Sequence, residues 1–123
     1  MNDPDFQAGM ALRREVLGDD YVDRAAGQAT ELTAPFQEFI TRFAWGAVWT
    51  RPGLDRATRS AITIALLTAL GHERELEAHI HGALRNGLSK DQIGEVLLHT
   101  AVYAGVPASN SAMAVAKRAL EGA

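Results

Sequence analysis

The stretch that decides the fold is residues 55–87, DRATRSAITIALLTALGHERELEAHIHGALRNG. It predicts two helices joined at Gly71, because glycine commonly ends a helix by adopting left-handed backbone angles without strain. Asp55 is a good N-cap for the first helix, which is expected over 56–70. The second helix is expected over about 73–86. The two helices together form the predicted centre of the fold.

Both predicted helices carry apolar stripes. The first helix is apolar on almost every side, which predicts a buried position. Its main stripe is Ile62, Ala65, Leu66, Ala69 and Leu70, with Ala61, Ile64 and Leu67 filling much of the rest. The buried stripe expected for the second helix is Leu76, Ile80, Ala83 and Leu84, with His79 inside it. Glu77 and His81 point elsewhere and are expected in solvent.

The first 50 residues predict further helices. Residues 3–17 have loose helical spacing and a plausible stop at Gly18, and residues 20–28 are expected to form one or two turns. From Thr33, as an N-cap, a stronger helix follows. Its apolar residues are Phe36, Phe39, Ile40, Phe43, Ala44 and Ala47. The simplest interpretation of the three phenylalanines is a core or interface helix, whereas Trp45 and Trp49, near Arg51, are better candidates for the wall of a binding site.

The C-terminal third predicts two more helices. Ser89 and Gln92 form a capping box, and the helix they begin ends at Gly105. Val106-Pro107 prevents that helix from continuing, and a last helix is expected over about 108–121. No segment alternates as a strand does. The sequence therefore predicts an all-α protein, with six or seven helices in one domain, residues 1–123.

Composition excludes several classes of function. The 123 residues are 47% apolar, and the net charge of −3 gives no basic surface for nucleic acid. There is no run of about 18 apolar residues to span a membrane, and the N-terminus lacks the features of a signal peptide, so we expect a cytoplasmic protein. The absence of cysteine excludes disulfides, thiolate metal ligands, CxxC redox centres and a cysteine nucleophile.

The histidines do not predict a metal site. The HERELEAHIH segment beginning at His72 contains several histidines and glutamates, but it lacks an HExxH motif. His79 and His81 are two residues apart, so their side chains diverge on a helix. We therefore expect no bound metal.

Glu75 and His79 are the first candidates for chemistry, since residues four apart share one helix face. From spacing alone, an ordinary partly exposed pair worth a few tenths of a kcal/mol is the better interpretation. Three observations favour a functional site. His79 lies in an apolar stripe, a second helix offers His99 and Tyr103, and an arginine cluster supplies charge for an acidic substrate. The cluster consists of Arg51, Arg56 and Arg59.

Specific stretches of the chain resemble a known family. They include ALRREVLGDDYVDRA, WGAVWTRPGL, the E-L-x-x-H of Glu75 to His79, and YAGVPASNSA. On these residues the chain closely resembles the carboxymuconolactone decarboxylase family, over nearly its whole length. The resemblance implies an all-α fold of the alkylhydroperoxidase D type and a homo-oligomer, a hexamer built of three dimers or a trimer.

The resemblance also implies an activity in the protocatechuate branch of the β-ketoadipate pathway. There, CO2 is removed from γ-carboxymuconolactone to give β-ketoadipate enol-lactone, without a cofactor. Peroxidases of the same fold use a CxxC and a histidine. If His79 matches that histidine, the two cysteine positions fall at His72 and Glu75, so thiol peroxidase chemistry is excluded here.

This implied reaction assigns expected roles to the candidate residues. Arginine is the natural bidentate partner of a substrate carboxylate, so Arg51, Arg56 and Arg59 are the expected anchors. His79, His99 or Tyr103 is expected to stabilise the developing oxyanion. His79 is expected to be the general acid that protonates a ring carbon, with a pKa near neutrality. Glu75 either orients His79 or lies near the departing carboxylate, and Trp45 or Trp49 provides an apolar wall.

Two other functions stay open from the sequence. One is a related cofactor-free enzyme that acts on another small lactone or acid. The other is a non-catalytic helical assembly or binding module, in which Glu75 and His79 are interface residues.

Overall fold

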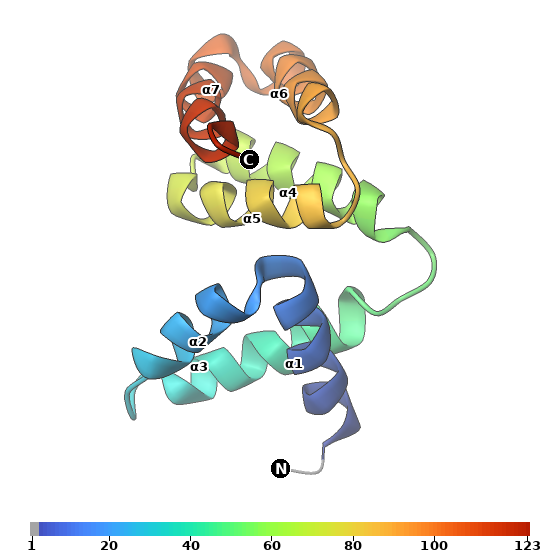
Figure 1. The fold of residues 1–123 in the computed structure, drawn as a ribbon, viewed down its shortest axis with the longest axis vertical. Coiled ribbons are helices and arrows are strands. Elements are labelled where there is room, and N and C mark those ends of the chain that lie inside the picture. Colours follow the sequence, from blue (N-terminus) through green and yellow to red (C-terminus); the bar gives the residue numbers. More distant parts are fainter. Residues whose placement is uncertain (1–2) are drawn as a thin grey trace. The chain divides into compact units, whose positions relative to one another are not determined.

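The structure, a computed structural model, describes residues 3–123, so the first two residues of the predicted 1–123 domain lie outside the described part. Within it the chain is helical and contains no strand, which confirms the all-α prediction. The helices, drawn in Figure 1, are α1 (Pro4–Leu17), α2 (Asp19–Gly27), α3 (Ala34–Ile40), the π-helical segment η1 (Thr41–Val48), α4 (Arg56–Leu70), α5 (Glu73–Arg85), α6 (Lys90–Ala104) and α7 (Val106–Leu120). They form two compact units that divide between Leu54 and Asp55.

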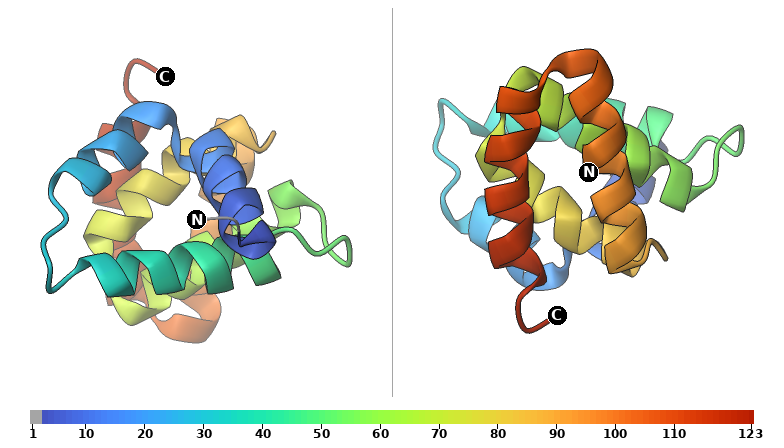
Figure 2. Two further views of the ribbon diagram at one scale, coloured as in Figure 1. Left: turned by 90° about the horizontal axis from the view of Figure 1, so that it is seen from below. Right: turned by 90° about the horizontal axis from the view of Figure 1, so that it is seen from above.

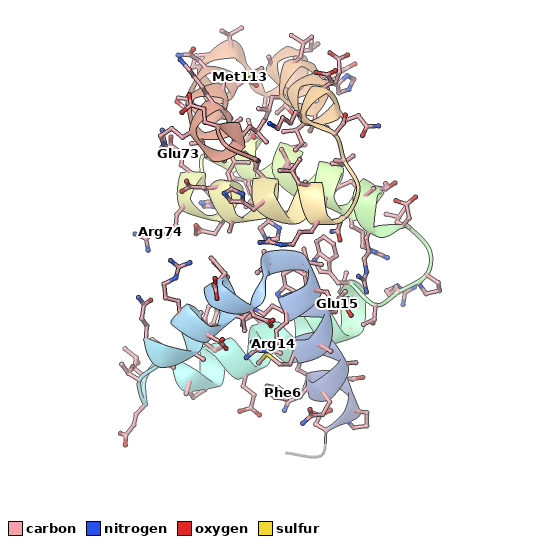
Figure 3. All side chains as sticks on the ribbon, viewed as in Figure 1. Phe6, Arg14, Glu15, Glu73, Arg74 and Met113 are labelled. Atoms are coloured by element: carbon pink, nitrogen blue, oxygen red, sulfur yellow. The ribbon has the colours of Figure 1, made fainter. Side chains whose placement is uncertain are left out.

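The first unit contains α1, α2, α3 and η1. Helix α1 begins at the predicted place, where the Asp3 carboxylate accepts a hydrogen bond of 3.0 Å from the backbone N–H of Asp5. Arg14 on α1, labelled in Figure 3, joins this helix to α2 through ion pairs of 3.1 Å with Asp19 and 2.9 Å with Asp23. On its other side α1 packs against η1.

The strong helix after Thr33 differs from the prediction in three ways. Thr33 occupies the predicted N-cap position, but its side chain does not cap the helix, because its hydroxyl instead accepts a hydrogen bond of 2.8 Å from the backbone N–H of Thr30. The helix widens after Ile40 into η1, where Trp49 N–H bonds to Ala44 O, five residues back, at 2.9 Å. The three phenylalanines are 56–60% exposed, so the core interpretation is wrong for Phe36, Phe39 and Phe43 within this chain.

The second unit contains α4 to α7. The pair α4 and α5 packs against the pair α6 and α7, as the two further views in Figure 2 show. Their facing sides bury one apolar core, which includes most of the stripe predicted for α5 and apolar residues of α4, α6 and α7. Its members are Ile64, Leu76, Ile80, Ala83, Ile93, Leu97, Ala112, Val115, Ala116 and Ala119.

Helix α4 buries a different face from the predicted one. Its fully buried residues are Ser60, Ile64 and Thr68, whereas the expected stripe is largely open. Ile62 is 44%, Leu66 56% and Leu70 66% exposed. The sequence pattern failed here because α4 has two apolar faces, and the chain by itself provides helices for only one of them.

The helix ends follow the sequence more closely. Asp55 Oδ1 accepts a 2.7 Å hydrogen bond from Thr58 N–H, Gly71 ends α4 with φ 76°, and Ser89 and Gln92 form the predicted capping box. Helix α7 starts at Val106, two residues earlier than predicted, because proline is favourable in the first turn of a helix. Within residues 3–123, no helix has the length and apolarity that a membrane span requires.

Candidate functional site

His79 lies in the middle of α5 and is partly buried. Burial lowers the pKa of His79 to about 4, because the low-dielectric surroundings disfavour the charged imidazolium. The carboxylate of Glu75, one turn earlier, acts in the opposite direction and raises that pKa. His79 is therefore a neutral imidazole at pH 7, which differs from the expected general acid with a pKa near neutrality.

Glu75 itself is exposed in the first turn of α5. Its position suits a carboxylate, since the N-terminal end of a helix carries partial positive charge. Glu75 and His79 thus form an exposed anion next to a partly buried neutral base. The electrostatic effect of Glu75 on His79 supports the predicted pairing of these two residues.

The arginines of the predicted cluster differ in exposure and in the unit they belong to. Arg56 is exposed and Arg59 is partly buried, both in the first turn of α4 in the second unit. Arg51 is exposed in the loop before Leu54 and belongs to the first unit. Arg56 and Arg59 thus share the first turn of α4, and the cationic cluster itself stays a prediction.

A hydrogen bond fixes the end of α5 beside the start of α4. The side-chain amide of Asn86 donates to the hydroxyl of Ser60 at 2.8 Å. His79 precedes Asn86 by two turns, which corresponds to about 10 Å along a helix axis. The arginines on the first turn of α4 and the imidazole on α5 therefore lie along the same pair of helices, whereas Glu75 lies a further turn away.

The two tryptophans stack on each other in the first unit. Their ring centroids are 4.8 Å apart and their planes make an angle of 22°. Trp45 is only 5% exposed, and Trp49 is partly buried. The pair is apolar and closely packed, but Trp45 is almost fully buried, so the role of the two rings as a wall stays a prediction.

His99 and Tyr103 contact each other on α6, with ring centroids 5.3 Å apart, and both are exposed. His99 also lines an open apolar cavity of about 350 Å³ between α4 and α6. The residues lining that cavity do not include Tyr103, Glu75 or His79. The second unit thus presents two polar groups on different helices, one around His79 and one around His99.

One polar residue of note was missed by the sequence analysis. Arg13 is 6% exposed and lies beside a cavity in the first unit. The available signal was its helical register, because Gly9, Val16 and Leu17 lie three or four residues away on the buried face of α1. Within residues 3–123, no group of three or more metal-ligating side chains is placed to hold a metal ion.

The fold and these side chains define a class: an all-α protein without cysteine, with a partly buried neutral imidazole and a carboxylate one turn apart on α5 and two arginines in the first turn of α4. Residues 34–118 match the carboxymuconolactone decarboxylase family. Because this match covers more than half of the chain, the protein belongs to the carboxymuconolactone decarboxylase family.

Two relatives extend the comparison beyond the matched region. A 4-carboxymuconolactone decarboxylase from Acinetobacter baylyi is 49% identical over 118 residues, 95% of this chain and 88% of the relative. A nitrosuccinic acid decarboxylase from Metarhizium robertsii is 44% identical over 115 residues, 94% of this chain and 80% of the relative. Both similarities extend across the two units of the chain.

Proposed function

We propose that this protein is a decarboxylase that converts 4-carboxymuconolactone (γ-carboxymuconolactone) to β-ketoadipate enol-lactone without a cofactor. The observation that carries the proposal is the 49% identity to a 4-carboxymuconolactone decarboxylase over 95% of this chain. Its support in the chain is a set of side chains that matches the needs of the reaction, namely cationic groups for the carboxylates and a proton carrier for the ring.

The reaction breaks one C–C bond and forms one C–H bond. The electron pair of the bond to CO2 moves through the ring double bond toward the lactone carbonyl, whose oxygen gains negative charge. A proton is then added at the ring carbon next to the carbonyl, which leaves the double bond of the enol-lactone. The protein must therefore anchor a carboxylate, stabilise an oxyanion and deliver one proton.

In this proposal Arg56 and Arg59 bind the substrate carboxylates, and a role for Arg51 stays a prediction. Guanidinium groups form paired charge-assisted hydrogen bonds with carboxylates. The position of Arg59 supports the role, because a partly buried guanidinium binds an anion more strongly than an exposed one.

His79 is proposed as the proton carrier. Its pKa of about 4 leaves it neutral in the resting protein. An arriving substrate brings two carboxylates, and negative charge near an imidazole raises its pKa. Substrate binding would thereby load His79 with the proton that the ring carbon later receives. Glu75 would favour the same charged form, in agreement with its effect on the pKa of His79. His99 or Tyr103 stays an alternative donor to the oxyanion.

The test is an assay of CO2 release and lactone conversion by the purified protein, with a chelator and without added cofactor. We expect turnover by the unchanged protein and a loss of about 10²–10⁴-fold in kcat for His79→Gln, the range for removal of a general acid or base. The matched control is His81→Gln, an exposed histidine two residues away on α5. Undiminished turnover by His79→Gln would remove the role assigned to His79.

The second candidate function is decarboxylation of a different small acid. It is favoured by the 44% identity to a nitrosuccinic acid decarboxylase. The same assay with nitrosuccinic acid distinguishes the two, since each candidate predicts the higher kcat/KM on its own substrate. No activity on either substrate, with a change of oligomer size in His79→Gln, would favour the non-catalytic assembly.

The proposal extends to assembly and location. A homo-oligomer, as a hexamer or trimer, is supported by apolar side chains left open on α4 and α6; they are Ile62, Leu66, Leu70, Leu98 and Val102. A single functional domain over residues 1–123 is supported by the family match, which begins in the first unit and ends in the second. The cytoplasmic location stays a prediction.

A further inference from the structure

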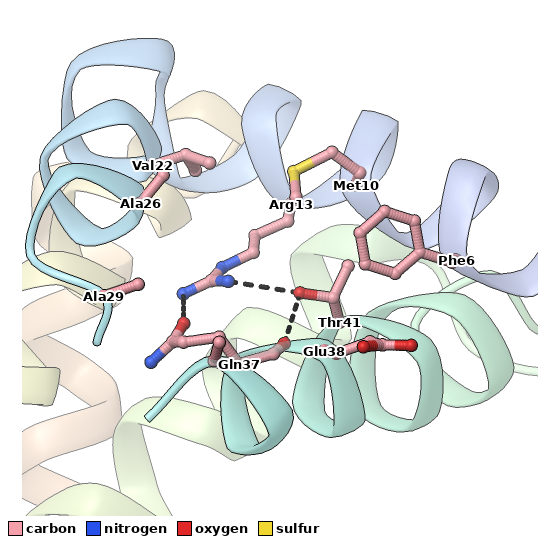
Figure 4. A pocket seen from close by; sticks show the side chains of 10 residues that line it. Phe6, Met10, Arg13, Val22, Ala26, Ala29, Gln37, Glu38 and Thr41 are labelled. Atoms are coloured by element: carbon pink, nitrogen blue, oxygen red, sulfur yellow. Dashed lines mark hydrogen bonds between the residues drawn. The ribbon is translucent and has the colours of Figure 1, made fainter. Parts of the chain in front are cut away.

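A cavity of about 410 Å³ lies entirely within the first unit (Figure 4). This volume is in the range of small-molecule binding sites. Helices α1, α2 and α3, the start of η1 and the turn before α3 contribute its walls, which are mostly apolar. The lining residues are Phe6, Met10, Arg13, Val22, Ala26, Ala29, Ala34, Gln37, Glu38 and Thr41.

The guanidinium of Arg13 has only neutral acceptors. Its Nη1 donates to the Thr41 hydroxyl and its Nη2 to the Gln37 side-chain oxygen, both at 3.2 Å. The Thr41 hydroxyl in turn donates to the backbone oxygen of Gln37 at 2.8 Å, and Figure 4 draws all three bonds. The Nε–H of Arg13 is buried and has no hydrogen-bond partner within residues 3–123. Among the same residues, no carboxylate forms an ion pair with Arg13.

This arrangement differs from that of the neighbouring arginine. Arg14 is one residue further along α1 and pairs with two aspartates. Glu38, the acidic residue that lines the cavity, is bound by Arg42 at 2.8 Å. A buried charge without a counter-charge is costly, and arginine stays ionised at pH 7 even when burial lowers its pKa, as it does for Arg13. The cavity therefore contains a cation that lacks its anion.

We propose that this cavity is a binding site for a small organic carboxylate, whose carboxylate pairs with Arg13 and whose apolar body lies against Phe6, Met10 and Val22. Carboxylate is the anion that best fits the planar donor pattern of a guanidinium. The apolar walls select an acid with a hydrocarbon body over inorganic phosphate or sulfate. The site does not depend on the proposed decarboxylation, because none of its residues was assigned a role in that reaction.

The first test uses benzoate, which is a flat apolar ring with one carboxylate, and benzamide as its uncharged analogue. Titrations are followed by amide NMR shifts and calorimetry. We expect benzoate to shift the signals of Arg13, Gln37 and Thr41, with benzamide bound about tenfold or more weakly, as expected when a hydrogen bond between charged groups is lost. Equal affinity for both compounds, or no shift of these signals, would overturn the proposal.

Two variants and a control make the test specific. Arg13→Gln should weaken benzoate binding about tenfold or more. Ala26→Phe, which fills the cavity and keeps Arg13, should weaken it as well, and it covers the case in which Arg13→Gln does not fold. Arg24→Gln removes the same charge from an exposed site on α2 and should bind benzoate like the unchanged protein. Unchanged binding by a folded Ala26→Phe would place benzoate elsewhere and overturn the proposal.

Competition identifies the source of the natural carboxylate. If 4-carboxymuconolactone displaces benzoate, the natural ligand is the substrate or product of the proposed reaction. If it does not, while benzoate binding persists and depends on Arg13, the ligand is a separate small acid. Benzoate binding by a protein that fails to decarboxylate the lactone would support this site and remove only the proposed function.

Discussion

Gly9 of α1 and Gly46 of η1 meet backbone to backbone where these two helices cross. A Cβ atom on Gly9 would lie 2.7 Å from the backbone nitrogen of Gly46 and 2.1 Å from the carbonyl oxygen of Thr41. A Cβ atom on Gly46 would lie 2.1 Å from the carbonyl oxygen of Asp5. All three distances are shorter than real Cβ contacts, so only glycine permits this approach. The crossing also brings Arg13 of α1 within hydrogen-bonding distance of Thr41.

Replacing Gly46 by alanine should therefore destabilise the protein. The added methyl group meets backbone atoms, which cannot rotate away, so we expect a loss of about 1–3 kcal/mol in the free energy of unfolding. Gly94→Ala is the matched control: Gly94 lies within α6, where a Cβ meets nothing within 4 Å. This control should be neutral or more stable by up to about 1 kcal/mol. Urea denaturation measures both changes, and equal midpoints would contradict the close approach.

The burial of His79 should make stability fall in mild acid. The folded pKa is lowered from 6.5 to about 4, so the unfolded chain takes up a proton first as the pH falls. Neutral His79 makes its full contribution to the free energy of unfolding above pH 6.5. That contribution, about 3 kcal/mol, is lost progressively as the pH falls from about 6.5 to 4. Urea denaturation at several pH values should show this slope.

The slope should be absent from this range in His79→Gln and retained in His81→Gln, which keeps His79. A slope of the same size in His79→Gln would assign the acid sensitivity to other groups. This measurement depends only on the burial of His79, so it is independent of any enzymatic activity.

Loss of the arginines on α4 should raise KM more than it lowers kcat. Arg59→Gln removes a charge-assisted bond to a substrate carboxylate, so we expect KM for the lactone to rise by about 10–100-fold. Arg56 is exposed, and Arg56→Gln should have a smaller effect. Arg118→Gln on α7, far along the chain and exposed, is the control and should leave KM unchanged. An unchanged KM in Arg59→Gln would remove Arg59 as an anchor.

The open apolar face of α4 should be an interface between copies of this chain. Leu66 is 56% exposed and lies between Ile62 and Leu70 on that face. Leu66→Glu would bury a charge in the proposed interface, so we expect a smaller species in sedimentation analysis. His81→Glu adds the same charge to the exposed side of α5 and should leave the size unchanged. A monomeric unchanged protein would contradict the proposed assembly.

The sequence predicted the local structure well where the signal was local. Asp55, Gly71 and the Ser89–Gln92 capping box set helix ends at the predicted residues, because capping depends on groups only a few residues apart. The buried stripe of α5 was also predicted, since that helix has a single apolar face. The sequence did not predict which face of α4 is buried, nor that the three phenylalanines are exposed. Helical periodicity locates an apolar face but does not identify what covers it.

For the site, the sequence determined which groups are present: a histidine and a glutamate one turn apart, arginines near the start of a helix, and no cysteine. Only the tertiary structure decided how deeply the side chains are buried, which partners they have and how the pKa of His79 is shifted. Burial of His79 lowers its pKa to about 4, and the approach of Gly9 to Gly46 encloses Arg13 among neutral acceptors. The physical reason is that desolvation and close backbone contact depend on packing between helices distant in the sequence, which helical periodicity does not encode.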